Sequence, residues 1–403
     1  MAYADRIQSQ IQALGDLPMP DSVALEHSER LYKHLNEQLQ SADMLFVDFM
    51  QQILYCPGLG YYSAGSHKIG AGGDFITAPE MSPLFGVAIA NQCAQVLQTQ
   101  PGDILEFGAG TGKLAVSVIQ RLSQLDCLPT NYFILEVSAD LKYRQQTLLK
   151  EQLPELFERF VWLEQLPSKF NGVVLANEVM DAMPVNLFRL RGDTPHEQVV
   201  SLASDGDWQI VDAEQNSEAF NTWWQTIGKS FVVDDEYQSE VNLQITPWLK
   251  ALSDCIETGL VLLIDYGYSR SEYYLQERSL GSLMCHYRHF NHPNPLLLPG
   301  LQDVTAHVDF TAVAEAGFDH GFDVLGYTTQ GAFLMACGIL DAAEDQLTGE
   351  MVQQLELSQV IKPLIMPEEM GELFKVMALG KGIDSVELGG LLGYQMGDMR
   401  RQL

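Results

Sequence analysis

Three glycines at alternate positions follow a carboxylate in this sequence. Glu106 stands two residues before Gly108, and Gly110 and Gly112 come next. The segment lies between a short apolar run at 103–107 and a helical run that begins near 113. Glycines at a strand-to-helix turn let the backbone approach a ligand and direct helix N–H groups toward it. The spacing therefore predicts a small-molecule site at this turn.

The class of ligand follows from what the turn lacks. A dinucleotide-binding turn needs a third glycine at 113, where Lys113 stands, and a P-loop needs Ser or Thr at 114, where Leu114 stands. A carboxylate ahead of the turn instead suits a cationic ligand without phosphate, with Glu106 facing an ammonium group. S-adenosyl-L-methionine is such a ligand.

A second carboxylate supports the same ligand. Glu136 ends the next apolar run, 24 positions after Gly112. An acidic residue at the carboxyl end of this strand can accept hydrogen bonds from both ribose hydroxyls. The alternative interpretation is a structural turn followed by a solvated glutamate. Taken together, the turn and the two carboxylates predict S-adenosyl-L-methionine as cofactor.

The elements around the turn have the pattern of an α/β fold. Short apolar runs separated by helical or loop segments are typical of a parallel sheet. We expect a doubly wound, mostly parallel sheet, closed at its far edge by two later runs. The strand candidates begin near 103, 131, 159, 172, 259, 322 and 373. We predict a helical N-terminal extension over 1–60, a main domain over 61–380 with an insertion at 190–255, and a C-terminal tail over 381–403.

Composition limits the class of protein. With 46% hydrophobic residues the chain can bury a large core, and 53 acidic against 23 basic residues give a formal charge of −30. This charge argues against nucleic acid or an anionic membrane as partner and fits a cationic one. Six scattered cysteines argue against a disulfide framework or a zinc site, so we expect no metal. Without an apolar span or signal segment, we expect a cytoplasmic location and no membrane.

Longer motifs extend over most of the chain, at 60–62, 73–80, 106–112, 135–138, 176–185, 265–267 and 299–310. Together they resemble a known family, the MidA-like S-adenosylmethionine-dependent methyltransferases. The resemblance implies a class I methyltransferase-like Rossmann fold. Mitochondrial members of this family are complex I assembly factors that dimethylate an arginine of a partner subunit.

The sequence departs from the mitochondrial members at three positions. Ala109 and Thr111 stand where those members tend to have proline and arginine, and Asn177 stands where they tend to have histidine. The glycines and carboxylates keep their register, so the cofactor prediction is unaffected. Asn177 lies where substrate would approach, so the resemblance alone does not transfer the substrate to this chain.

Catalytic candidates follow the fourth strand of the predicted sheet. Asn177, Glu178 and Asp181 come after its carboxyl end, where ligands bind in open α/β sheets. If a helical turn begins after Asn177, Glu178 and Asp181 share a face and can hold a guanidinium group bidentately. We predict Glu178 as the first catalytic carboxylate, Asp181 as the second, and Asn177 as an orienting amide. The alternative is a helix N-terminus stabilised by acidic side chains.

A loop rich in glycine, proline and aromatic residues precedes the sheet. Within it, Asp74 and Thr77 offer hydrogen bonds and Phe75 offers an apolar wall, so we predict that this loop covers the cofactor and excludes water. A packed surface loop is the alternative interpretation.

The sequence therefore predicts a protein methyltransferase that acts on an arginine in a basic segment of a partner protein. Two alternatives stay open: a small-molecule methyltransferase, which needs an enclosed pocket, and an assembly factor that binds the cofactor without turnover. The sequence does not define the oligomeric state.

Overall fold

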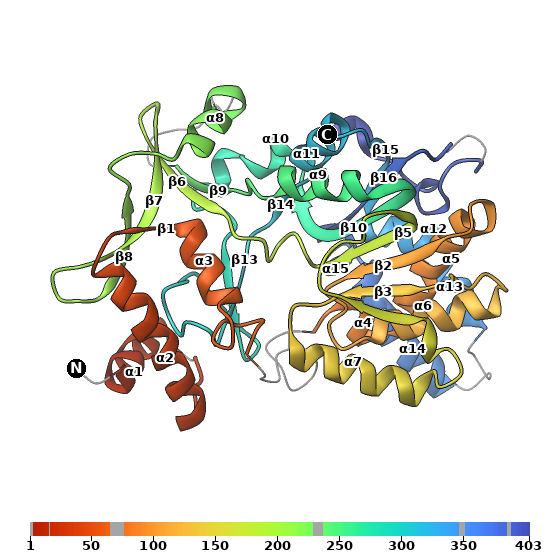
Figure 1. Cartoon of the computed structure of the whole chain (residues 1–403), viewed down its shortest axis with the longest axis horizontal. Helices are drawn as coiled ribbons and strands as arrows, with labels where there is room; N and C mark the ends of the chain where they lie inside the picture. The colour runs from red at the N-terminus through yellow and green to blue at the C-terminus, as the bar shows by residue number, and fades with distance from the viewer. Residues whose placement is uncertain (1–2, 16, 65–75, 229–236, 346–350, 385–387) are drawn as a thin grey trace. The chain divides into compact units, whose positions relative to one another are not determined.

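The computed structural model describes residues 3–15, 17–64, 76–228, 237–345, 351–384 and 388–403 (Figure 1). Its contacts divide the chain into two compact units, each assembled from three segments. Unit 1 comprises Met1–Phe75, Asp181–Gln244 and Ser271–His307. Unit 2 comprises Ile76–Met180, Ile245–Arg270 and Val308–Leu403.

Unit 2 is built on an eight-stranded sheet in the order β15-β16-β10-β5-β2-β3-β4, with β14 paired to β10. Strands β2, β3, β4, β5 and β10 run parallel, and β16 is antiparallel to both of its neighbours. This confirms the predicted mostly parallel α/β sheet. The strands are β2 (Asp103–Phe107), β3 (Tyr132–Leu135), β4 (Phe160–Leu163), β5 (Phe170–Asn177), β10 (Ile256–Tyr268), β14 (Val308–Asp309), β15 (Asp323–Thr329) and β16 (Phe374–Lys381).

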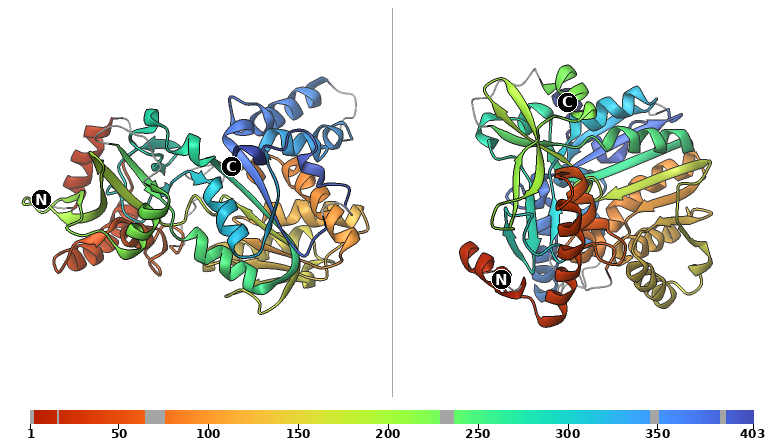
Figure 2. Two further views of the ribbon diagram at one scale, coloured as in Figure 1. Left: turned by 90° about the horizontal axis from the view of Figure 1, so that it is seen from above. Right: turned by 60° about the vertical axis from the view of Figure 1, so that its left-hand side comes forward.

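Both faces of this sheet are buried. Along β10, Leu262 belongs to the large core cluster that includes helices α5 and α6, while the neighbouring Leu263 is equally buried on the other face. Near-continuous apolar strands are expected when a parallel sheet is covered on both sides. The helices of this unit are α4 (Ala78–Met81), α5 (Pro83–Thr99), α6 (Lys113–Gln124), α7 (Ala139–Gln152), α9 (Ile245–Cys255), α11 (Phe310–Asp319), α12 (Gln330–Ala336), α13 (Ile339–Glu344), α14 (Met351–Ile365) and α15 (Met370–Leu373). Figure 2 shows α9 and α11 side by side along the sheet.

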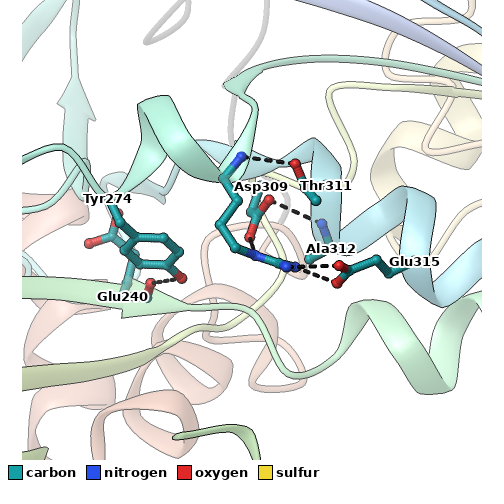
Figure 3. Close-up of polar contacts among 7 residues, drawn as sticks. Glu240, Tyr274, Asp309, Thr311, Ala312 and Glu315 are labelled. Atoms are coloured by element: carbon teal, nitrogen blue, oxygen red, sulfur yellow. Dashed lines mark hydrogen bonds and ion pairs between the residues drawn. The ribbon is translucent and has the colours of Figure 1, made fainter. Parts of the chain in front are cut away.

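An ion-pair network ties the segment after β10 to helix α11 (Figure 3). Asp309 Oδ1 accepts a hydrogen bond from the Ala312 N–H at 3.0 Å and so caps α11, and its Oδ2 pairs with Arg270 Nε at 3.1 Å. The Arg270 guanidinium also pairs with Glu315 at 2.6 Å. Asp309 belongs to the motif at 299–310, so this end of the motif has a structural role.

Unit 1 contains two smaller sheets and several helices. Its five-stranded antiparallel sheet has the order β1-β7-β6-β9, with β8 paired to β7, and a three-stranded sheet has the order β12-β11-β13. The strands are β1 (Met44–Leu45), β6 (Asn186–Arg191), β7 (Thr194–Leu202), β8 (Trp208–Asp212), β9 (Gln238–Val241), β11 (Met284–Tyr287), β12 (Phe290–His292) and β13 (Asp303–Thr305). The helices are α1 (Tyr3–Leu14), α2 (Ser22–Leu39), α3 (Phe46–Tyr55), α8 (Glu218–Thr226) and α10 (Arg270–Tyr273), whose first residue is counted with unit 2.

This division differs from the predicted boundaries at 60, 190–255 and 380. The predicted N-terminal extension and most of the predicted insertion share one sheet, because Met44 of β1 pairs with Val200 of β7. They also share one core, in which the rings of Phe49 and Trp208 lie 5.5 Å apart. Helix α9, assigned to the insertion, belongs to unit 2. The partners are far apart in sequence, so apolar periodicity could not pair them.

The predicted C-terminal tail also packs into a core. Tyr394, in a single turn of 3-10 helix over Leu392–Tyr394, lies with its ring 5.6 Å from that of Phe333 on α12. It is a buried member of the main cluster of unit 2. Residues 388–403 are therefore part of unit 2 and not a separate appendage.

Candidate functional site

The glycine turn adopts the conformation that only glycine accommodates readily. Gly108, Gly110 and Gly112 have φ values of +58°, +52° and +91°. The turn closes with a hydrogen bond from the Gly112 N–H to the Ala109 carbonyl at 2.8 Å, and α6 begins at Lys113. An L-residue with a side chain is strained at each of these positions. The alternation of glycines is therefore a backbone requirement of this turn.

Glu106 lies near the carboxyl end of β2, just before the turn, and is almost fully buried, with 3% of its surface exposed. Its Oε2 accepts a hydrogen bond from the Tyr132 hydroxyl at 2.7 Å. Burial raises the pKa of Glu106 to about 7, the hydrogen bond from Tyr132 opposes the rise, and the charge of Glu136 adds to it. A nearby positive charge would favour the ionised form of this carboxyl group.

Glu136 follows β3 directly, and both of its carboxylate oxygens have protein donors. Oε1 accepts from the Ser138 N–H at 2.8 Å, and Oε2 accepts from Gln145 Nε2 at 3.0 Å. Burial raises the pKa of Glu136, and the hydrogen bonds from Ser138, Gln145 and Val137 oppose this rise. A carboxylate has about four acceptor positions, so Glu136 can still accept a hydrogen bond from a ligand hydroxyl.

The end of the predicted cover loop is anchored to the glycine turn. Glu80, on α4, accepts hydrogen bonds from the Thr111 hydroxyl and from Lys113 Nζ, the latter at 2.7 Å. Thr77 is the N-cap residue of α4, and its carbonyl accepts from the Glu80 N–H at 2.9 Å. The other two predicted loop residues, Asp74 and Phe75, lie outside the described residues.

The end of β5 has an unusual backbone. Glu178 has a φ of +53°, a left-handed conformation that is uncommon and costly for a residue with a side chain. Its N–H donates to the Ile264 carbonyl of β10 at 2.9 Å, and its Oε1 accepts from Asn177 Nδ2 at 3.1 Å. Asn177 Oδ1 is buried and has no hydrogen-bond partner within the described residues. Backbone strain of this kind clusters at functional sites.

Asp265 of β10 holds the residues that follow Glu178. Its Oδ2 accepts from the Met180 N–H at 2.9 Å, its Oδ1 accepts from the Tyr266 N–H at 2.9 Å, and its side chain is buried. The hydrogen bond from the Glu178 N–H to the Ile264 carbonyl holds one end of the strained turn, and the bond from the Met180 N–H to Asp265 holds the other.

The predicted helical turn after Asn177 is wrong. The left-handed backbone at Glu178 interrupts any helix there, and the residues from 178 to 183 form bends and turns instead of a helix. Glu178 belongs to unit 2 and Asp181 to unit 1. Asp181 is buried, and its carbonyl accepts from the Ala306 N–H at 3.0 Å. The two carboxylates therefore do not lie on one helix face, and the catalytic role of each stays a prediction.

Sequence reasoning missed Gln145, Trp162 and Tyr132, whose side chains support the two carboxylates. Tyr132 and Trp162 lie in strands that were predicted, but neither was linked to the site. Gln145 had one usable signal: together with Leu149, four residues later, it forms the buried side of α7. A polar residue at an apolar-face position needs a polar partner.

The described part of the chain lacks two further features. No helix in it is both long enough and apolar enough to cross a membrane. In the same residues, no group of three or more His, Cys, Asp or Glu side chains is placed to hold a metal ion.

The comparisons with known proteins establish the family. The chain matches a model of S-adenosyl-L-methionine-dependent methyltransferases over residues 88–328, more than half of its length, and it belongs to this family. A crystal structure from Burkholderia thailandensis, bound to S-adenosyl-homocysteine, is 39% identical, has a TM-score of 0.91, and is aligned over 96% of this chain and 100% of its own. The protein is an S-adenosyl-L-methionine-dependent methyltransferase, and S-adenosyl-L-methionine is its cofactor.

Curated relatives share most of the length at lower identity. The Caenorhabditis elegans protein named "Protein arginine methyltransferase NDUFAF7 homolog, mitochondrial" is 27% identical over 90% of this chain and 89% of its own. The Homo sapiens protein of the corresponding name is 26% identical over 87% of this chain and 83% of its own. Both are named mitochondrial proteins, and this finding overturns the predicted cytoplasmic location.

The residues of unit 2 fit this cofactor. The turn from 108 to 112 has the left-handed glycines that let a ligand approach the backbone, and Glu136 can still accept from a diol. Glu106 offers a carboxyl group that a cationic ligand would ionise. The buried Asn177 Oδ1 is an acceptor that a ligand N–H would satisfy.

Proposed function

We propose that this protein transfers methyl groups from S-adenosyl-L-methionine to an arginine side chain of a partner protein. The observation that carries the proposal is Glu178, a carboxylate held in a strained conformation at the carboxyl end of β5. Relatives named as protein arginine methyltransferases align over most of the chain, at 24–28% identity, and support the same acceptor. The formal charge of −30 is compatible with a basic substrate segment.

We assign the unit 2 fold to the class I methyltransferase-like Rossmann type. The support is the strand order, in which the sequence-ordered strands β2, β3 and β4 run outward from the centre in one direction and β5 and β10 in the other. This reversal at β2 and β5 is the switch point at which open α/β sheets bind ligands. Glu106 lies near the carboxyl end of β2, and the glycine turn follows that strand; Asn177 is the last residue of β5, and Glu178 comes next.

The cofactor residues divide between the two ends of the ligand. Glu136 accepts the ribose hydroxyls, the glycine turn lies along the ligand, and Glu106 faces its ammonium group. We assign Thr77 to the cover of this site, and the anchoring of α4 by Glu80 supports that assignment.

Transfer requires a guanidinium group that is held, aimed and deprotonated. When bound, S-adenosyl-L-methionine supplies a methyl group on positively charged sulfur, suited to in-line displacement by a nitrogen. The Glu178 carboxylate holds the guanidinium through charge-assisted hydrogen bonds and accepts the proton that the nitrogen loses. Asn177 Oδ1 orients a second N–H of the same group. The methylated arginine and S-adenosylhomocysteine are the products.

Isotope transfer tests this function. The purified protein is incubated with a lysate and S-adenosylmethionine labelled in its methyl group, and labelled proteins are hydrolysed and analysed for methylarginines. Glu178→Gln keeps the shape of the side chain but removes its charge and basicity. We expect it to lower kcat by about 100-fold or more while the affinity for S-adenosylhomocysteine changes by less than about twofold.

A matched substitution controls for the loss of one acidic residue. Glu151 is exposed on α7, so Glu151→Gln should leave turnover unchanged. Label in methyl-lysine or in small molecules alone would refute the arginine acceptor. Tight cofactor binding without any labelled product would show an assembly factor that does not turn over its ligand.

A further inference from the structure

Gln145 connects three parts of the cofactor site. Its Nε2 donates to the Gly110 carbonyl at 2.9 Å and to Glu136 Oε2 at 3.0 Å, and its Oε1 accepts from Trp162 Nε1 at 2.9 Å. The side chain is fully buried. One amide thus joins the glycine turn, the carboxylate after β3 and the strand β4.

The chemistry of these contacts requires an amide. A primary amide has two N–H donors and one carbonyl acceptor, and here the two donors serve Gly110 and Glu136 while the acceptor serves Trp162. A glutamate would lack both donors and would place a second negative charge beside Glu136. A methionine would fill the volume without making any of the three hydrogen bonds.

Gln145 also restricts the space beside the turn. A Cβ atom added at Gly112 would lie 3.5 Å from Gln145 Cα and Cγ, so α7 packs directly against the glycine turn at this residue. Because Gln145 Oε1 also accepts from Trp162 Nε1, both polar atoms of the amide are held. Rotation of the Gln145 side chain would therefore break its hydrogen bonds to Gly110 and Glu136 together.

We infer that Gln145 is a positioning residue of the cofactor site: it fixes the Glu136 carboxylate relative to the glycine turn so that the carboxylate can accept both ribose hydroxyls. The inference rests on the proposed contact between Glu136 and the ribose. Gln145 acts through Glu136, and its bonds to the Gly110 carbonyl and to Trp162 hold the amide in place.

The test measures recognition of the ribose hydroxyls. Calorimetry gives the affinity of the full chain for S-adenosylhomocysteine and for its 2′,3′-dideoxy analogue. Because hydrogen bonds to a carboxylate are strong, we expect wild-type protein to prefer S-adenosylhomocysteine by about 100-fold. Gln145→Met should weaken S-adenosylhomocysteine binding by about 10-fold or more and leave the analogue nearly unchanged, so that the preference shrinks.

Three further variants make the test specific. Gln92→Met removes another fully buried glutamine, on α5, that bonds to Gln95 and Gly393, and it should keep the full ribose preference. Trp162→Phe keeps an aromatic side chain and removes the N–H donor to Gln145, so a loss of about two- to fivefold in the same preference is expected. Added to Glu136→Gln, Gln145→Met should have almost no further effect on affinity.

The outcomes separate this inference from the role assigned to Glu136. Wild-type protein that binds both ligands equally would overturn the ribose contact and the inference with it. Wild-type preference that survives intact in both Gln145→Met and Trp162→Phe would overturn the inference alone. Equal weakening of both ligands by Gln145→Met would show a purely structural side chain, and the milder Trp162→Phe decides the question if Gln145→Met does not fold.

Discussion

The carboxylates beside the glycine turn and the carboxylate after β5 are held in place by different means. Glu106 and Glu136 are positioned by side-chain partners, Tyr132 and Gln145 respectively, and their backbone is not strained. Glu178 is positioned by its own left-handed backbone, which depends on hydrogen bonds to β10. The proposed cofactor half of the site therefore relies on buried polar networks, and the proposed transfer half relies on local strain.

The two halves should therefore respond differently to substitution. A network of side chains loses one hydrogen bond at a time, so its substitutions should change affinity in steps. A strained residue persists only while its surroundings enforce the conformation, so a substitution at a neighbouring residue can displace it. Substitutions in the two halves should consequently affect different kinetic constants.

The largest effect should come from the glycine turn itself. Gly110→Val places a β-branched residue at a φ of +52° beside the ligand, and we expect the affinity for S-adenosylhomocysteine to fall by more than about 100-fold. Calorimetry measures the affinity. Gly206→Val is a control in a turn of unit 1 with a φ of +85° and open space around it, and it should bind normally. Retained affinity in Gly110→Val would mean that this turn is not the ligand site.

The next effect tests the transfer half. Asp265→Asn replaces one carboxylate oxygen by an NH2 group that cannot accept from the N–H of Met180 or Tyr266. The turn that carries Glu178 should relax, so we expect kcat to fall by about 10- to 100-fold while the affinity for S-adenosylhomocysteine stays within about twofold. Turnover and calorimetry on the same preparations give the two numbers.

A matched aspartate separates this effect from a general loss of charge. Asp319 is exposed at the end of α11, and Asp319→Asn should leave both constants unchanged. If Asp265→Asn weakened cofactor binding as much as turnover, the distinction between the two halves of the site would be wrong.

The two halves also differ in how far the sequence could predict them. Glu106, the three glycines and Glu136 lie in short motifs whose local spacing determines their place, so the turn and the strand ends were predictable. The support of Glu136 by Gln145 and Trp162 was not, because these residues meet only when α7 and β4 pack beside the turn. The conformation of Glu178 was not predictable for the same reason: it depends on Asp265, 87 positions later.

The predicted domain boundaries differ from the observed units for the same reason: the units depend on contacts between residues that are far apart in the sequence. Strand periodicity found the runs of the unit 2 sheet, since each run carries its own apolar pattern. It did not show that Met44 would pair with Val200, because a pairing over such a distance leaves no local pattern. Local signals thus predicted elements well and their assembly into units poorly.

The smallest expected effect concerns the protonation of Glu106. Because the pKa of this buried carboxyl group is raised to about 7, its ionised fraction rises by about tenfold between pH 6 and pH 8. If the ionised form binds the ammonium group, the affinity for S-adenosylhomocysteine should rise by up to about tenfold over this range. Glu106→Gln, which cannot ionise, should show a flat profile, and calorimetry at several pH values distinguishes the two.

Stability should change with pH in the opposite direction, which makes the test of Glu106 specific. Its pKa is about 7 in the folded protein against an ordinary value of 4.5, so the folded state binds the proton more tightly. The free energy of unfolding contributed by this group therefore falls as pH rises from about 4.5 to about 7, by about 3 kcal/mol, and is constant above that range. Glu106→Gln should remove this loss and be more stable than wild type at pH 8, by denaturant unfolding, while binding the cofactor more weakly. A variant that is both less stable at pH 8 and unchanged in affinity would contradict the placement of a buried, ionisable carboxylate at the ammonium end of the ligand.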